Sequence, residues 1–192
     1  MNQVKHTQLL ILASVCLLAG CAMRSGSPYA TPREVNRNSL RAQELTREAA
    51  ELLDHDPQKA EHLLREALTA DLYYGPGHNN LGVMYLKQGQ LYEAANEFEW
   101  ARKLMPGHPD PRMNLALTLE RAGRIEEALA TYDTALEVYP NHLPTMQALC
   151  RCQLRHNRSD DRTGEMLKEI ALRGETQQWR SWARQQLTLL PP

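Results

Sequence analysis

A stretch of 34 residues is followed at once by a second stretch that aligns with it without a gap. The first copy, 75–108, reads GPGHNNLGVMYLKQGQLYEAANEFEWARKLMPGH, and the second, 109–142, reads PDPRMNLALTLERAGRIEEALATYDTALEVYPNH. Similar residues recur at shared positions: Gly82 and Ala116, Tyr85 and Leu119, Gly89 and Gly123, Ala94 and Ala128, Phe98 and Tyr132, Ala101 and Ala135, Pro106 and Pro140. A unit this short cannot bury its apolar face alone, so neighbouring copies must stack to form a continuous core.

The spacing within one copy predicts two helices joined by a turn. Small and apolar residues fall at helical spacing along two faces, one with Leu81, Gly82 and Tyr85 and the other with Ala94, Phe98 and Ala101. The small residues Gly82 and Ala94 predict a close approach of the two helices, with Phe98 filling the space beside them. Gly89 stands where the first helix should end and a positive φ is favoured, and Pro106 stops the second helix.

This pattern resembles the tetratricopeptide repeat, and the resemblance implies an all-α helical solenoid of helix-turn-helix units. Weaker copies flank the two clear ones, from Leu40 to Tyr74 upstream and from Leu143 to Glu175 downstream. The stretch from Glu175 to Leu190 predicts a final solvating helix. We therefore expect a domain over 37–192 that contains about three repeats, a degenerate fourth repeat and a C-terminal capping helix.

The N-terminus carries a second resemblance. Lys5 precedes a run of roughly ten largely apolar residues, which is too short to span a bilayer and is typical of a secretory signal. The run ends in Leu18-Ala19-Gly20-Cys21, which resembles the lipobox of bacterial lipoproteins. The resemblance implies a signal peptide over 1–20 and diacylglyceryl and acyl chains, such as palmitate, on Cys21. The alternative is an ordinary signal peptide that leaves Cys21 free.

The residues after Cys21 predict a tether and a location. The stretch 21–36 contains Ser, Gly and Pro and is expected to be flexible. Ala22 and Met23 follow the cysteine where an aspartate would retain a lipoprotein in the inner membrane, so the resemblance implies an outer-membrane protein that faces the periplasm. Two or three acyl chains on one residue give lasting anchorage, whereas a single chain binds reversibly.

Charge and motifs argue against several classes of function. Removing residues 1–20 takes away one basic residue and leaves 21 basic against 23 acidic residues. A chain so close to neutral offers no basic stripe for nucleic acid. The sequence has no phosphate-binding glycine loop, nucleophile elbow or zinc-protease motif. We therefore expect no enzyme activity, no cofactor and no metal.

Cys150 and Cys152 stand two apart on a predicted helix, so their side chains diverge and a mutual disulfide is unfavourable. We interpret both as packed helix residues, with an intermolecular bridge in an oxidising periplasm as the alternative. Cys152 and His156 are four residues apart and offer a metal only two ligands, whereas a structural zinc site takes four.

The resemblance implies that function lies on the concave surface formed by the first helices. Carried over residue by residue, its partner-binding positions fall on Asn79, Asn80, Val83, Leu86, Lys87, Asp110, Met113, Asn114, Leu117, Glu120 and Arg121, and, with less certain register, on Gln147, Arg151, Leu154 and Arg155.

These positions predict an apolar strip that leads into a basic end. The strip comprises Val83, Leu86, Met113 and Leu117, and the basic end comprises Arg121, Arg151 and Arg155. Such a groove suits an extended or helical peptide with apolar anchors and an acidic end.

Two polar positions leave the ligand open. Asn80 and Asn114 either contact a ligand backbone or cap and solvate their own helices. Relatives that bind chaperones clamp a terminal carboxylate with Lys and Asn, but the matching positions here are Asp110 and Asn114, which argues against that ligand.

Together these features predict a membrane-anchored interaction scaffold of the bacterial cell envelope. Its partner would be an envelope protein or peptide segment, and its role would be to assist pilus or secretion-system assembly, as pilotin-type lipoproteins do. The alternatives are an accessory subunit or scaffold for peptidoglycan enzymes, and binding of a small acidic ligand.

Overall fold

A computed structural model of the chain describes residues 37–190. Over that range it contains nine α-helices and no strand. The helices are α2 (Ser39–Leu52), α3 (Pro57–Ala70), α4 (Gly75–Lys87), α5 (Leu91–Leu104), α6 (Asp110–Arg121), α7 (Ile125–Val138), α8 (Leu143–Arg155), α9 (Asp161–Arg173) and α10 (Gln177–Leu189). The expected all-α solenoid with a C-terminal capping helix is therefore confirmed. The expected signal peptide, tether and lipidated Cys21 lie outside the described residues.

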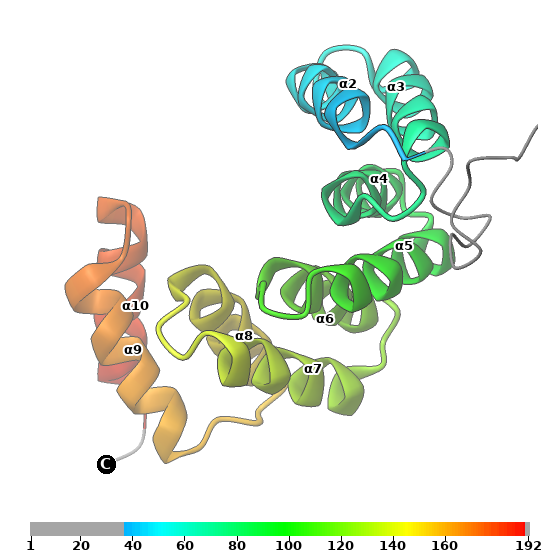
Figure 1. Cartoon of the computed structure of the whole chain (residues 1–192). Coiled ribbons are helices and arrows are strands. Elements are labelled where there is room, and N and C mark those ends of the chain that lie inside the picture. Colours follow the sequence, from blue (N-terminus) through cyan, green and yellow to red (C-terminus); the bar gives the residue numbers. More distant parts are fainter. Residues whose placement is uncertain (1–36, 191–192) are drawn as a thin grey trace, which may run out of the picture. The chain divides into compact units, whose positions relative to one another are not determined.

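Consecutive helices pair as hairpins, α2 with α3, α4 with α5 and α6 with α7, and the hairpins follow one another in chain order (Figure 1). The first helices α2, α4, α6 and α8 also contact one another in sequence. At the C-terminal end, α9 packs more extensively on α10 than on α8. Among the helices described, none combines the length and the apolar character that crossing a membrane requires.

The predicted close approach of paired helices occurs at Gly82. A Cβ atom at this position would lie 2.7 Å from a ring carbon of Phe98, which is too close for any side chain. Phe98 is fully buried. The equivalent positions in the other hairpins hold Ala49, Ala116 and Cys150, all of which are fully buried, so Cys150 takes the small-residue position of its repeat.

Helices α8 and α9 form a fourth hairpin, and the second helices share one burial pattern in all four hairpins. Three positions spaced by four and three residues are fully buried in each: Ala60, Leu64 and Ala67; Ala94, Phe98 and Ala101; Ala128, Tyr132 and Ala135; Thr163, Leu167 and Ile170. The last set follows the third by 35 residues, because the loop before α9 is longer. The fourth hairpin thus keeps the geometry of the repeat although it has lost its alanines.

The turns between paired helices require a left-handed residue. Gly89 and Gly123 have φ values of 76° and 77°, as the sequence predicts, and Asn157 has a φ of 54° at the corresponding place. Asparagine is one of the few residues that enter this region readily. In the first hairpin the shorter turn instead uses Asp56, whose side chain accepts from the amide of Lys59 and caps α3.

The buried side chains form two clusters. The N-terminal core extends from Ala42 on α2 to Ala128 on α7, and the C-terminal core extends from Ala116 on α6 to Ala183 on α10. Helices α6 and α7 contribute to both clusters. The faces of the first helices that lie beside these clusters therefore form one surface supported by both cores.

Candidate functional site

The candidate site is the surface of α4, α6 and α8 that carries the predicted partner-binding positions, and we call it the first-helix face. Residues along it recur at equivalent repeat positions: Asn79, Met113 and Gln147; Asn80 and Asn114; Val83, Leu117 and Arg151; Leu86, Glu120 and Leu154; Lys87, Arg121 and Arg155. Spacing of three and four residues places each set on one side of its helix.

The predicted apolar strip is only partly open. Val83 and Leu117 are half-buried against the N-terminal core, and Met113 is half-buried against the C-terminal core. Leu86 is 6% exposed and belongs to the N-terminal core itself. The apolar surface available to a partner therefore comes from Val83, Met113 and Leu117.

Asparagine side chains join neighbouring repeats on this face. Asn114 Nδ2 donates to Asn79 Oδ1 at 3.1 Å, and Asn79 Nδ2 donates to Asn80 Oδ1 at 3.5 Å. The hydrogen bond of Asn114 therefore goes to the preceding repeat, a role that neither of the two sequence-based interpretations includes.

The predicted basic residues reach back to the preceding repeat. Arg121 Nη1 donates to the backbone oxygen of Leu86 at 3.1 Å, at the C-terminal end of α4. Arg155 pairs with Glu120, whose side chain is 7% exposed. Lys87 Nζ lies 2.5 Å from Asp54 Oδ1. Each of these cations therefore already has a hydrogen-bond or ion-pair partner in the preceding repeat. Fewer of their N–H groups remain free for an acidic partner.

Arg151 differs from the other cations because it contacts an aromatic ring. Its guanidinium carbon lies 5.8 Å from the ring centroid of Trp179 on α10, which itself packs edge-on against Trp182 at 5.3 Å. Together with Gln178 these residues line a cavity of about 320 Å³. The sequence predicts only a solvating helix over Glu175 to Leu190, and the contact between Arg151 and Trp179 depends on the packing of α8 against the C-terminal end.

Like Glu120, Gln147 is a buried polar residue of the first-helix face. Its side chain is 6% exposed, and its Nε2 has no hydrogen-bond partner within residues 37–190. Gln147 lies one helical turn before Arg151, so the two side chains share a side of α8. A buried donor without an acceptor costs about 1–3 kcal/mol, but this nitrogen is enclosed and offers no exposed donor to a bound molecule.

Other cavities lie against the second helices. A cavity of about 410 Å³ between α5, α6 and α7 is lined by Tyr92, Leu119 and Arg124, among others. Another cavity, of about 430 Å³, lies between α3, α4 and α5 and is lined by Trp100 and His78, among others. The ring nitrogens of His78 contact Glu97 Oε2 at 2.6 Å and the backbone oxygen of Leu72 at 2.9 Å.

The two cysteines of α8 are buried free thiols, in agreement with the sequence-based interpretation. Burial raises the pKa of the Cys150 thiol to about 12. Burial, together with the nearby carboxylate of Glu120, raises the pKa of the Cys152 thiol to about 11. Both thiols are therefore protonated at neutral pH and are poor nucleophiles.

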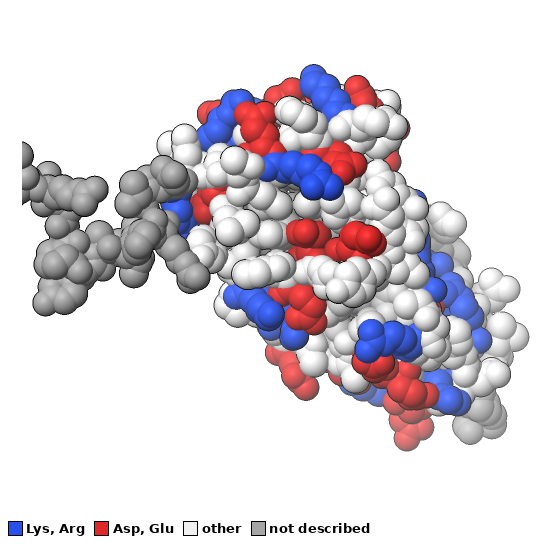
Figure 2. Space-filling view, turned by 90° about the vertical axis from the view of Figure 1, so that its right-hand side faces the viewer, with Lys and Arg blue, Asp and Glu red and all other residues white. Residues whose placement is uncertain are grey.

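Surface charge is mixed rather than segregated on the side that Figure 2 shows, where basic and acidic side chains alternate. Many exposed charges are paired across helices, as in Arg41 with Glu66 at 3.0 Å and Arg162 with Asp133 at 2.6 Å.

The sequence over residues 85–151 matches the family model for the tetratricopeptide repeat. No curated protein matches the sequence. Among solved structures, TTC0263, a thermophilic TPR protein of Thermus thermophilus, is similar with a TM-score of 0.65 and 20% identity, over 77% of this chain and 81% of that chain.

Two further similar structures contain peptides. The first TPR of Spaghetti (RPAP3), bound to the HSP90 peptide SRMEEVD, matches with a TM-score of 0.59 and 17% identity, over 64% of this chain and 98% of that chain. The second TPR domain of human RPAP3, in complex with the HSP70 peptide SGPTIEEVD, matches with a TM-score of 0.55 and 16% identity, over 59% of this chain and 96% of that chain. The fold of the described residues is that of tetratricopeptide-repeat proteins.

Proposed function

Because the described helices form a tetratricopeptide-type stack, we propose that this protein is a non-enzymatic scaffold of the bacterial cell envelope that binds a segment of a partner protein on its first-helix face. The observation that carries the proposal is the partly open apolar surface of Val83, Met113 and Leu117, which lie at predicted partner-binding positions on adjacent first helices. Apolar side chains of a bound peptide pack against these three residues.

The bound peptide differs from those in the two similar complexes. Both of those peptides end in Glu-Glu-Val-Asp. In this chain the positions that match a carboxylate clamp hold Asp110 and Asn114, and Asn114 is already bonded to Asn79. A ligand with apolar side chains and an acidic group near Arg151 fits the face better than a C-terminal carboxylate does.

Capture with crosslinking in the native organism tests the binding surface. We expect Met113→Glu with Leu117→Glu to reduce recovery of the partner at least about tenfold, because two carboxylates would be buried against apolar groups. The matched control is Tyr92→Glu with Leu172→Glu, which places the same charges on α5 and α9 at side chains that are 77% and 75% exposed. Equal recovery with the wild type and the first-helix variant would place the partner on another surface.

The identity of the captured partner separates the envelope processes. A secretin, pilin or secretion ATPase supports assembly of a pilus or secretion system, and a cell-wall hydrolase supports the peptidoglycan alternative. Turnover of a substrate by the purified protein alone would contradict the non-enzymatic role.

The proposed anchor is a set of acyl chains on Cys21, with the domain in the periplasm beside the outer membrane. The support is the Leu18-Ala19-Gly20-Cys21 sequence. We expect Cys21→Ser to abolish incorporation of a labelled fatty acid and to release the protein from the membrane fraction. Cys150→Ser, which changes a buried thiol of α8, should leave both unchanged. Continued acylation of the Cys21→Ser protein would refute the anchor.

A further inference from the structure

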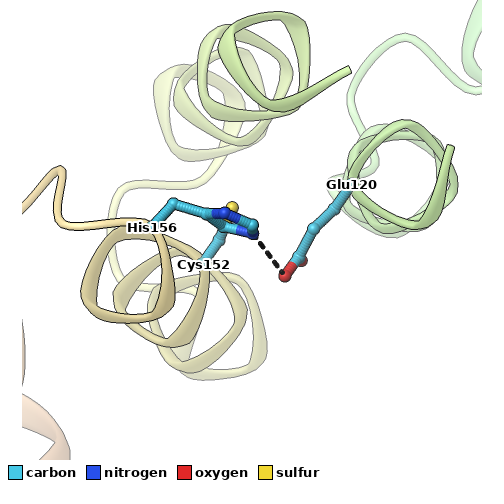
Figure 3. A group of neighbouring side chains, drawn as sticks. All are labelled: Glu120, Cys152 and His156. Atoms are coloured by element: carbon cyan, nitrogen blue, oxygen red, sulfur yellow. Dashed lines mark ion pairs between the residues drawn. The ribbon is translucent and has the colours of Figure 1, made fainter. Parts of the chain in front are cut away.

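Three side chains of metal-ligating type meet between the third and fourth repeats (Figure 3). Glu120 comes from α6, Cys152 comes from α8, and His156 is the residue that caps the C-terminus of α8, four residues after Cys152. One ligand atom of each residue lies within 4.8 Å of the others. His156 Nε2 lies 3.9 Å from Glu120 Oε1. The pair Cys152 and His156, which the sequence offers as two ligands, thus gains a third ligand from the neighbouring repeat.

Glu120 is a charged residue at a repeat position where the neighbouring repeats have an apolar residue. The equivalent residues are Leu86 and Leu154, so this position carries leucine on both sides of it. The Glu120 side chain is nevertheless 7% exposed. Burial of a carboxylate costs several kcal/mol unless cations or hydrogen bonds compensate it. A buried charge in place of an apolar residue therefore points to a role that leucine cannot perform.

The residues around Glu120 only partly account for it. Arg155 pairs with Oε1, and the hydroxyl of Tyr132 lies 3.4 Å from Oε2. The Arg155 side chain is 53% exposed, so it can turn into solvent without disturbing the core. Neither contact involves Cys152 or His156, although both face the same carboxylate.

We propose that Glu120, Cys152 and His156 bind one divalent transition-metal ion of intermediate softness, for which Zn²⁺ is the representative. Thiolate, imidazole and carboxylate are all ligands that zinc accepts, and three protein ligands leave a fourth position for water or a partner group. On binding, the Cys152 thiol loses its proton to solvent and its sulfur forms the metal bond, while Arg155 leaves Glu120. The ion joins α6 to α8 and so couples the third repeat to the fourth.

Cobalt provides a direct test on the purified, chelator-treated protein. We expect one equivalent of Co²⁺ to give a thiolate charge-transfer absorption together with visible bands of a four-coordinate ion, and one equivalent of Zn²⁺ to displace it. Loss of the charge-transfer absorption in Cys152→Ala supports the site. A Co²⁺ spectrum of the wild type without any thiolate absorption would overturn the proposal, and this measurement does not depend on whether a variant folds.

Substitution of each proposed ligand tests which residues bind the metal ion. We expect Cys152→Ala, His156→Gln and Glu120→Leu each to weaken Zn²⁺ binding at least about tenfold, because loss of a residue that only supports a metal ligand already costs that much. Glu120→Leu installs the residue of the neighbouring repeats and should keep the fold. The matched control is Cys150→Ala, which removes the other buried thiol of α8. Equal Zn²⁺ affinity of the wild type and all three variants would refute the site.

Discussion

The hairpin α4–α5 and the hairpin α8–α9 share one geometry but differ in the chemistry of their interiors. In the first, Gly82 meets Phe98 among alanines. In the second, the same positions hold Cys150 and Leu167, and four polar side chains are buried as well: Thr145, Gln147, Gln153 and Thr163. The position in the repeat therefore specifies that the side chain is buried and which way it points, while the polarity of the interior differs between hairpins.

Several buried polar groups of the hairpin α8–α9 form hydrogen bonds with one another. The hydroxyl of Thr163 donates to Gln153 Oε1 at 3.0 Å and accepts from the amide of Asp160 at 3.0 Å. The Thr163 amide in turn donates to Asp160 Oδ1 at 2.8 Å, which completes a capping box at the start of α9. The middle hairpins begin their second helices without any side-chain cap hydrogen bond, so packing stabilises them where hydrogen bonds stabilise α9.

The largest expected effect compares the two interiors directly. Phe98→Ala should lower the free energy of unfolding by about 3–5 kcal/mol, because it opens a cavity beside Gly82 that neighbouring atoms cannot fill. Leu167→Ala, at the equivalent position, should cost about 2–5 kcal/mol. Urea unfolding of the purified protein, followed by circular dichroism, measures both. A loss below about 1 kcal/mol for Phe98→Ala would show that the middle hairpins are not tightly packed.

A smaller effect is expected from the hydrogen bonds of the last hairpin. Thr163→Val keeps the shape of the side chain but leaves Gln153 Oε1 and the Asp160 amide without the hydroxyl, which should cost about 1–3 kcal/mol. Thr163→Ser keeps the hydroxyl and should cost less than Thr163→Val in the same urea experiment. If the two substitutions cost the same, packing rather than hydrogen bonding stabilises this hairpin.

The smallest expected effect is a pH-dependent change in the free energy of unfolding, and it comes from the N-terminal end of the stack. Asp71 is buried between α3 and α4, where it accepts from Ser39 Oγ at 2.6 Å, Tyr73 N at 3.0 Å and Arg37 Nε at 3.1 Å. Burial alone would raise the pKa of Asp71, but these hydrogen bonds outweigh burial and hold its pKa below the ordinary value of 3.8. The stabilisation is therefore present above about pH 4 and is lost as the pH falls through the lowered pKa.

We expect Asp71→Asn to cost on the order of 1 kcal/mol at pH 7 and to flatten the loss of stability in acid. Urea unfolding from pH 7 down to pH 2 measures this slope. Asp54→Asn, which changes an exposed carboxylate paired with Lys87, is the control and should have little effect because such pairs contribute little. An unchanged acid slope in Asp71→Asn would exclude this carboxylate as a source of the pH dependence.

Much of the fold follows from residue order, because small residues and turn residues recur at spacings that only paired helices satisfy. The sequence of the fourth hairpin resembles the repeat less clearly, because its loop is longer and because Thr163, Leu167 and Ile170 replace two small residues and an aromatic. Burial rather than residue identity reveals that it keeps the same pattern.

The candidate site was less predictable, because contacts between repeats depend on the reach of side chains. The sequence places Leu86 on an open strip, but it lies in the N-terminal core. It places Arg155 at a basic end, but Arg155 pairs with Glu120. The sequence signal for the cluster with Cys152 and His156 is a glutamate where the neighbouring repeats have leucine, and the three side chains meet only because α6 and α8 are adjacent.

The cations that reach back give the stack a direction. Lys87 contacts Asp54, Arg121 contacts Leu86 and Arg155 contacts Glu120, in each case a residue about one unit earlier. In each of these three contacts the later unit supplies the donor and the earlier unit supplies the acceptor. An engineered chain that duplicates a whole unit of 34 residues would keep each donor within reach of an acceptor, whereas an insertion of half a unit would separate all the pairs downstream of it.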